Sequence, residues 1–276
     1  GSSSVGDVTR ATTDYTGSSF RVMADRTTDN PATGASAWTS YMSDSEATKS
    51  GSSSYWQTAI SYYLPSSGTL RFYAYTSTQA ASATALSPNS SRTAGNAPAF
   101  SVSGQLDSQY DLLVAGPTDV AYSATAPIAV TFTHAMAAVW FSVKDDSMDG
   151  TIGTVTIPGV SNSGTYTVGT GWDSLGSSTD YAVSYDDHDS NTELLLVIPQ
   201  SLDGKTVTIQ FTPTGGTQTS LTATLPSGLS LAAGYRYELQ LNVSNDEVTV
   251  STASIAGWTN PYGSTPPDDF TQIKTK

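Results

Sequence analysis

The sequence predicts an all-β protein made of two antiparallel β-sandwich domains in tandem. Short runs of residues alternate between apolar and polar with a period of two, which is typical of strands with one buried face. Turn residues separate these runs at short intervals, and no window has the period of a long amphipathic helix. The 276-residue chain is rich in serine and threonine and has 15 tyrosines, a composition that suits sheets with hydroxyl-bearing outer faces.

The stretch Pro127–Lys144 (PIAVTFTHAMAAVWFSVK) is the centre of this prediction. Its apolar residues occupy even positions up to Phe132 and odd positions from Val139 onward. A shift of one residue turns every side chain of a strand to the opposite face. The small residues between the two runs, His134–Ala137, are therefore expected to hold a bulge, a bend or a crossing between sheets. We interpret the stretch as one long, kinked strand pair in the middle of a sandwich.

The first domain is predicted to span residues 20–170, after a polar and mobile segment at residues 1–19. Its clearest strand is Leu70–Tyr75, in which the even-numbered residues point inward. The odd-numbered residues, including Tyr73 and Tyr75, are expected to point outward. Further strands are expected at Phe20–Ala24, Trp38–Met42, Leu112–Ala115, Thr154–Ile157 and Thr165–Val168.

A small, polar segment at residues 169–179 marks the predicted boundary to a second domain, residues 171–258, which a polar tail follows at residues 259–276. This domain has the pattern of a meander, and its best strand alternates from Tyr235 to Val243. The run Leu194–Ile198 is apolar throughout, as expected of a strand covered on both faces. Other strands are expected at Tyr181–Tyr185, Thr206–Phe211, Leu221–Leu225 and Val248–Val250.

The composition argues against several classes of function. A net charge of −13 repels nucleic-acid backbones, so we expect no nucleic-acid partner. The chain has no cysteine for thiolate metal sites, for a nucleophile or for disulfides. No apolar run is long enough to span a bilayer. The opening Gly1–Ser4 is expected to be a processed or engineered start that follows a removed export signal.

The sequence contains no motif of a catalytic or cofactor-binding site. We therefore predict that the protein is not an enzyme and that it uses no cofactor. Of the two histidines, His134 is expected to be packed or hydrogen-bonded near the bulge. Nothing in the sequence brings it to His188, so we predict no histidine metal site.

Two acidic segments are candidates for metal binding. Asp187–Glu193 begins with the spacing of a calcium loop. However, Thr192 replaces the required glycine, and Ile198 stands where a bidentate carboxylate is needed. We expect no tight calcium site there. The acidic turn at Asp145, Asp146 and Asp149 is likewise expected to be a solvated loop.

The tryptophans allow two interpretations. Exposed rings can form a platform for a sugar, whereas buried rings only pack in the core or at the edge of a sandwich. Packing is the more common arrangement, and we expect it here. The residues concerned are Trp38, Trp56, Trp140, Trp172 and Trp258.

Six segments occur in an order and spacing that are typical of one protein family. They are Leu70–Tyr75 (LRFYAY), Asp111–Ala115 (DLLVA), Val130–Ala137 (VTFTHAMA), Ile198–Gln200 (IPQ), Leu231–Tyr237 (LAAGYRY) and Ile255–Trp258 (IAGW). In this pattern, over about residues 8–258, the sequence resembles the fimbrillin family of Bacteroidales, in its fimbrillin-like branch.

The resemblance implies two stacked transthyretin-like sandwiches and export as a lipoprotein to the outer membrane. It implies a structural subunit or tip adhesin of a cell-surface fimbria, with membrane contact only through a lipid anchor that is removed or absent. It further implies that a trypsin-like protease removes an N-terminal strand and that the emptied groove accepts a C-terminal strand of the next subunit. The implied partners are other fimbrial subunits, in a homo- or heteropolymer, and a host or bacterial surface glycan or protein.

Within this scheme Arg10, followed by Ala11, is the candidate for proteolytic processing, because it lies next to a threonine-rich segment. The donor strand is predicted in the C-terminal part of the chain. The alternative hypothesis is a carbohydrate-binding surface lipoprotein that uses exposed aromatic residues. The donor candidates are Val248, Val250, Ile255 and Trp258.

Overall fold

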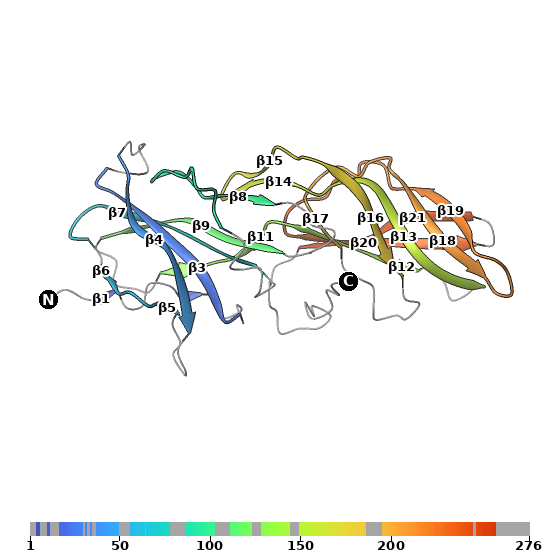
Figure 1. The fold of residues 1–276 in the computed structure, drawn as a ribbon, viewed down its shortest axis with the longest axis horizontal. Helices are drawn as coiled ribbons and strands as arrows, with labels where there is room; N and C mark the ends of the chain where they lie inside the picture. The colour runs from blue at the N-terminus through green and yellow to red at the C-terminus, as the bar shows by residue number, and fades with distance from the viewer. Residues whose placement is uncertain are drawn as a thin grey trace.

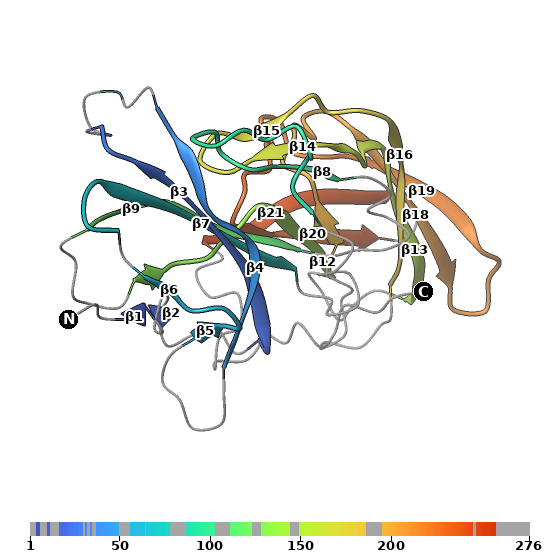
Figure 2. The ribbon, with the colours of Figure 1, turned by 60° about the vertical axis from the view of Figure 1, so that its left-hand side comes forward.

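The computed structural model describes residues 4–5, 10–11, 17–29, 31, 34, 37–49, 56–63, 65–77, 87–102, 111–122, 128–143, 149–185, 195–244 and 247–257. These residues form strands joined by turns, with no α-helix among them, so the all-β prediction is confirmed (Figures 1 and 2). None of the described segments forms a helix that could cross a membrane. The strands are β1 (Ser4–Val5), β2 (Arg10–Ala11), β3 (Ser19–Thr27), β4 (Thr39–Lys49), β5 (Trp56–Thr58), β6 (Tyr62–Tyr63), β7 (Thr69–Ser77), β8 (Ala99–Val102), β9 (Leu112–Ala121), β10 (Ala129–Val130), β11 (Thr133–His134), β12 (Ala137–Val143), β13 (Gly150–Ser161), β14 (Gly164–Thr167), β15 (Gly171–Asp173), β16 (Ser178–Ser184), β17 (Leu195–Val197), β18 (Thr206–Pro213), β19 (Thr219–Thr224), β20 (Tyr235–Ser244) and β21 (Glu247–Gly257).

The first half of the chain is organised around a six-stranded antiparallel sheet in the order β11-β9-β7-β3-β4-β5. β3 and β7 lie at its centre and pair from Arg21↔Tyr75 to Thr27↔Thr69. The face that holds Phe20, Leu70 and Phe72 forms the first core, which we call the N-terminal core. Its other buried residues are Val22, Ala24, Met42, Ala47, Trp56, Ala74, Leu113, Ala115, Ile128, Val130 and Phe132.

The opposite face of this sheet is also buried, which corrects the outward orientation predicted for Tyr73 and Tyr75. Both rings are almost fully buried, at 2% and 1% exposure. They form a middle core because a small sheet, in the order β15-β14-β8, packs over them. The other buried members of this core are Met23, Phe100, Leu112, Val114, Ala135, Tyr166 and Val168.

β9 continues to Ala121, well beyond the predicted end at Ala115. The register with β7 shifts between Phe72 and Ala74, so a bulge lies at this point. Gly116 adopts a φ of 105° there, in the left-handed region. A Cβ at this position would lie 2.5 Å from the Phe72 carbonyl oxygen, so only glycine fits.

The N-terminal core is covered by short strands rather than by a second large sheet. β1 pairs with β6, and β2 pairs with β10. Tyr62 of β6 packs against this core, and Val130 of β10 belongs to it. This half of the protein is therefore a sandwich with one continuous sheet and one layer built from two-residue ladders (Figure 2).

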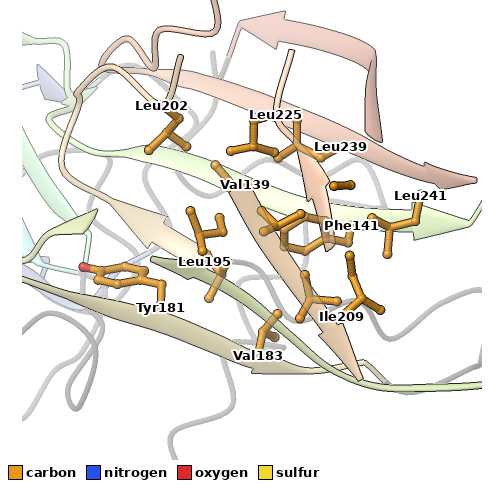
Figure 3. Close-up of a cluster of buried hydrophobic side chains, with 14 of the residues drawn as sticks. Val139, Phe141, Tyr181, Val183, Leu195, Leu202, Ile209, Leu225, Leu239 and Leu241 are labelled. Carbon is orange, nitrogen blue, oxygen red and sulfur yellow. The ribbon is translucent and has the colours of Figure 1, made fainter. Parts of the chain in front are cut away.

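The second half of the chain forms a sandwich of two four-stranded sheets, in the orders β17-β12-β20-β21 and β16-β13-β18-β19. Alternate residues of both sheets interdigitate in the C-terminal core (Figure 3). Phe141 and Leu239 come from one sheet, and Val183 and Ile209 from the other. All four are at most 4% exposed. The predicted inward phase of Tyr237, Leu239 and Leu241 is confirmed.

The chain crosses between the two halves at His134–Ala137. β11 pairs with β9 in the six-stranded sheet, whereas β12 pairs with β17 and β20 in the second sandwich. Of the three possibilities named for this small-residue patch, the structure has a crossing between sheets. The change of core falls between Ala135 and Ala137, so β12 and β13 share the C-terminal core although they precede the boundary predicted at residue 170.

The second sandwich is not a meander. Among the described strands of this sandwich, only β18–β19 and β20–β21 are successive strands that pair with each other, while β16 and β17 lie in different sheets. β12 and β20 pair in parallel, from Ala138↔Arg236 to Val143↔Leu241. This parallel pair is an exception to the predicted antiparallel arrangement. Alternation within a strand predicts which of its faces is buried. It does not predict which other strand will pair with it.

Candidate functional site

The segment predicted to be removable is paired with the first sandwich. Ser4 and Val5 of β1 pair antiparallel with Tyr63 and Tyr62 of β6. Arg10 and Ala11 form β2, which pairs in parallel with Ala129 and Val130 of β10. The processing candidate Arg10 therefore lies in a ladder of only two residues, in which few backbone hydrogen bonds hold the strand.

A group of buried apolar side chains lies directly next to β2. Ile128, Val130 and Phe132, on and beside β10, are 6%, 4% and 8% exposed and contribute to the N-terminal core. The Phe132 ring meets that of Phe20 edge-on at 5.3 Å, and Phe20 lies 5.1 Å from the Trp56 ring. These rings bury a large area and fix the shape of the face that the short strands cover.

The donor candidates occupy a different part of the molecule. β21 pairs with β20 along its length, from Glu247↔Ser244 to Gly257↔Tyr235, at the edge of its sheet. Val248 is 5% exposed in the C-terminal core, and Val250 packs against it. The backbone of Ile255 pairs with Tyr237, and Trp258 lies outside the described residues. Within the described part of the chain, β21 and β2 lie in different sheets, so the structure does not bring Val248, Val250 or the Ile255 backbone to β2 (Figure 2).

The crossing between the halves holds a buried histidine–aspartate contact that the sequence analysis missed. His134 Nδ1 contacts Asp111 Oδ2, and both side chains are at most 1% exposed. Burial raises the pKa of Asp111, while His134 and the backbone of Met136 act in the opposite direction. The expectation that His134 is packed or hydrogen-bonded is confirmed, and His188 lies outside the described residues. The signal was an aspartate placed directly before the apolar strand Leu112–Ala115.

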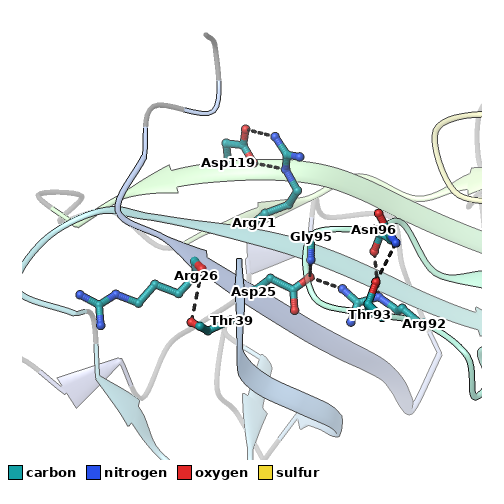
Figure 4. A network of polar contacts seen from close by, with 9 residues as sticks. All are labelled: Asp25, Arg26, Thr39, Arg71, Arg92, Thr93, Gly95, Asn96 and Asp119. Atoms are coloured by element: carbon teal, nitrogen blue, oxygen red, sulfur yellow. Dashed lines mark hydrogen bonds and ion pairs between the residues drawn. The ribbon is translucent and has the colours of Figure 1, made fainter. Parts of the chain in front are cut away.

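A polar network lies on the face of the six-stranded sheet that carries the middle core (Figure 4). The buried Asp25 accepts hydrogen bonds from Arg92 and, at 2.9 Å, from the Gly95 amide. These bonds tie the loop at residues 87–98 to β3. Arg71 pairs with Asp119 through two hydrogen bonds of 2.7 and 2.8 Å. All four charges are neutralised within the network, so its role is structural.

The acidic metal candidates are only partly within the described residues. Asp187–Glu193, Asp145 and Asp146 lie outside them. Asp149 is described, and its carbonyl oxygen accepts a 3.1 Å hydrogen bond from the Thr214 amide. Within the described ranges, histidine and acidic residues form no group of three or more that could hold a metal ion.

The four described tryptophans do not form a platform. Trp56 is 3% exposed. Trp38 and Trp140 are half-buried under Arg71 and Arg236, at 4.5 and 5.0 Å. The half-buried Trp172 meets Tyr166 edge-on at 5.4 Å. The large exposed rings in the described part of the chain are tyrosines instead: Tyr63, Tyr122 and Tyr235.

Comparison with known proteins identifies the family. The sequence profile of the fimbrillin-like family matches residues 9–258. The chain belongs to the fimbrillin-like family. This match confirms the resemblance found in the sequence. Membership of the family implies that the protein is located at the cell surface, in fimbriae. No curated protein sequence matches the chain.

Solved structures share the fold of this fimbrillin-like protein. A candidate cell adhesion protein of Bacteroides uniformis matches with a TM-score of 0.60 and 18% identity, over 93% of this chain and 96% of the other. One of Bacteroides ovatus matches with 0.56 and 16%, over 88% of each chain. One of Bacteroides eggerthii matches with 0.54 and 14%, over 92% of each chain. The likeness extends over nearly the whole chain, so it covers both sandwiches.

Proposed function

We propose that this fimbrillin-like protein is a non-enzymatic structural subunit or tip adhesin of a bacterial surface fimbria. Subunits join by strand exchange after a protease removes an N-terminal strand. The exported protein reaches the outer membrane as a lipoprotein, and its two halves are tandem transthyretin-like domains. Its partners are other fimbrial subunits and a receptor on a host or bacterial surface.

The observation that carries the proposal is the position of β2. Arg10 and Ala11 pair with β10 over only two residues, directly beside the N-terminal core. Removal of this strand exposes a sheet edge next to an apolar face, which proteins otherwise avoid. A strand from another subunit restores the ladder by β-augmentation. Cleavage after Arg10 releases β1 and the first residue of β2, and it therefore converts a closed subunit into one that accepts a partner.

The burial of two β21 valines supports a narrower choice of donor strand. Val248 and Val250 already contribute to the C-terminal core, and burial of a valine contributes about 1.5–3 kcal/mol. If β21 left β20 to act as donor, both contributions would be lost. We therefore assign the donor to Trp258 and residues 259–276, with Val248, Val250 and Ile255 as the fixed base of the arm. Ordering the arm costs about 1–2 kcal/mol per residue for the backbone, so apolar anchors must offset that cost.

Limited proteolysis of the full chain tests the proposal. Mild trypsin treatment should cleave after Arg10 and produce a ladder of oligomers, measured by gel and by mass in solution. Arg10→Gln should remain monomeric under the same treatment. Arg21→Gln is the matched control, because it removes the same charge from the central strand β3, and it should polymerise like the wild type.

Deletion of residues 259–276 should leave the cleaved chain monomeric. A cleaved wild type that stays monomeric at high concentration, or an Arg10→Gln variant that polymerises equally well, contradicts the strand-exchange proposal.

A further inference from the structure

The second sandwich has one sheet that is buried on both of its faces. In the sheet β17-β12-β20-β21, Val139 and Leu195 point into the C-terminal core (Figure 3). Ala138 and Leu196 alternate with them, so their side chains lie on the outer face of the sheet. Both are nevertheless fully buried, at 0% exposure. Trp140, the next residue of β12 on this face, is half-buried. We call Ala138, Trp140 and Leu196 the outer patch.

The outer face of the opposite sheet, β16-β13-β18-β19, is different. Its outward residues on β18 and β19 carry mostly hydroxyl groups, and Thr206, Ser220, Thr222 and Thr224 are exposed. Such a face is typical of an antiparallel sheet with one side in water. The burial of the outer patch is therefore a property of one sheet and not of the sandwich as a whole.

The small sheet covers only one end of the buried outer face. Met136 and Ile198 lie on this face next to the crossing between the two halves, and they form a cluster with Val102 of β8. Ala138 and Leu196 belong to none of the apolar clusters of the described residues. The small sheet therefore does not account for the burial of the outer patch.

The chain leaves this same sheet beside the outer patch. β21 is the edge strand, and it ends at Gly257. One residue before that end, a row of paired residues crosses the whole sheet. The row consists of Ala256, Arg236, Ala138 and Leu196. Neighbouring strands lie about 4.8 Å apart, so the three steps of the row span about 14 Å. About five residues beyond Gly257, at about 3.3 Å each, are enough to cross it.

The residues beyond Gly257 have a composition that suits the outer patch. They include four aromatic or large apolar side chains, which are Trp258, Tyr262, Phe270 and Ile273. They also include the pair Asp268 and Asp269, whose charge is opposite to that of Arg236, which stacks on the Trp140 ring at 5.0 Å. A segment tethered to the sheet has an effective concentration in the millimolar range. It therefore outcompetes a second copy of the chain at lower concentration.

We propose that residues 258–276, which we call the donor arm, lie on the outer patch of their own subunit before assembly. The role of this arm as a donor strand rests on the proposed function, whereas its docked position does not. A docked arm is not available to the next subunit, so the outer patch and the groove of that subunit compete for the same residues. Polymerisation then needs two events, which are removal of the N-terminal strand and release of the arm.

Disulfide trapping in the intact, uncleaved chain tests the docked position. The chain has no cysteine, so introduced thiols react without background. Glu238→Cys places a thiol on the outer face, because Glu238 pairs with Trp140 and is half-buried. Thr208→Cys is the matched control on the outer face of the opposite sheet, at another half-buried position. Each variant is combined with a second cysteine at one position of the arm in turn, from Tyr262 to Thr271.

Mild oxidation should close a disulfide within one chain, and mass spectrometry of the monomer detects it. At least one arm position should react with Glu238→Cys roughly 10-fold faster than with Thr208→Cys, because docking raises the local concentration of the arm. The proposal is overturned if no arm position shows this preference, or if the disulfides join two chains instead of closing within one.

A second variant releases the arm without a cysteine. Trp140→Ala should make chymotryptic cleavage after Phe270 roughly 10- to 100-fold faster, as expected for the loss of one buried aromatic contact. Thr208→Ala should be cleaved like the wild type. An unchanged rate in a folded Trp140→Ala chain overturns the proposal, and the disulfide test decides it if that variant does not fold. After trypsin treatment, Trp140→Ala should also form oligomers sooner. An arm that is trapped in a chain that never polymerises supports the docked position and contradicts strand exchange, so the two proposals fail separately.

Discussion

The indole N–H of Trp172 donates a 2.6 Å hydrogen bond to the carbonyl oxygen of Ala135. Ala135 lies at the crossing between the two halves, and Trp172 comes from β15 of the small sheet. The same ring packs against the middle core and against a cluster of Val102, Met136 and Ile198. One side chain thus links the small sheet, the crossing strand and the start of the second sandwich.

The first prediction concerns this link. Trp172→Phe keeps an aromatic ring but removes the donor to Ala135, and a buried acceptor left without its partner costs about 1–3 kcal/mol. Denaturant unfolding should show a loss of stability in this range. Trp140→Phe is the control, because Trp140 is half-buried under Arg236 and makes a cation–π contact that phenylalanine can retain in part. Equal losses in both variants would mean that the hydrogen bond contributes nothing.

A second prediction concerns the phase of β20. Leu239 is fully buried in the C-terminal core, whereas Gln240 is only half-buried on the other face. Leu239→Ala should cost about 2–5 kcal/mol, because it removes buried methyl groups and leaves a cavity. Gln240→Ala should change stability by about 0.5 kcal/mol or less. Melting temperatures of the two variants test this, and a larger loss for Gln240→Ala would refute the assigned phase.

The same substitution should have opposite effects at two buried tyrosines. Tyr237 Oη donates to the Ser230 carbonyl at 3.1 Å and accepts from the Ala232 amide at 2.8 Å. Tyr237→Phe should therefore destabilise the protein by about 1–3 kcal/mol. The Tyr181 hydroxyl is buried without a hydrogen-bond partner in the described part of the chain. Tyr181→Phe should leave stability unchanged or raise it, and a clear drop in its melting temperature would show that the hydroxyl has a partner.

Because several tyrosines are buried, we expect the protein to lose stability at alkaline pH. Burial raises the pKa of Tyr75, Tyr166 and Tyr181 above the ordinary value of about 10. Above that pH the unfolded chain releases these protons while the folded chain keeps them, so stability falls as pH rises. Each such tyrosine adds about 1.4 kcal/mol per pH unit to the slope.

Tyr→Phe substitutions can show how much each tyrosine contributes to the slope of stability against pH. Tyr166→Phe should reduce it by one proton, because that ring no longer ionises on unfolding. Tyr122→Phe, at a position that is 52% exposed, is the comparison variant for a tyrosine outside the cores. Tyrosinate absorbance should rise together with unfolding. If it rose fully while the protein stayed folded, the buried rings could not be the cause.

The sequence predicted strands well where the pattern of apolar and polar residues alone determines which face of the strand is buried. Leu194–Ile198 was expected to be covered on both faces, and its described residues, from Leu195 onward, are at most 2% exposed. The change of phase after Phe132 correctly indicated a break, and the structure shows that it is a crossing between sheets. These predictions depend only on the period of two and on local residue size, which are properties of single strands.

The wrong predictions of burial concern side chains that are covered by a segment far away in the sequence. Tyr73 and Tyr75 alternate with apolar residues, yet β8 and β14 bury them from the other side. Tyr235 is a different case: it starts a well-patterned strand but is 45% exposed, because it lies at the strand end.

The parallel pairing of β12 with β20 has a consequence for biogenesis. Ser142 Oγ donates to Glu238 Oε1 at 2.8 Å across 96 positions of the chain. The sheet that starts at β12 therefore cannot close until the ribosome has nearly finished translation, and contacts of such long sequence separation form slowly. Until then β12 can pair only with β17, and its parallel partner β20 is missing. The newly made chain thus has a long interval in which a chaperone can keep it unfolded for export, and in which it is most prone to aggregate.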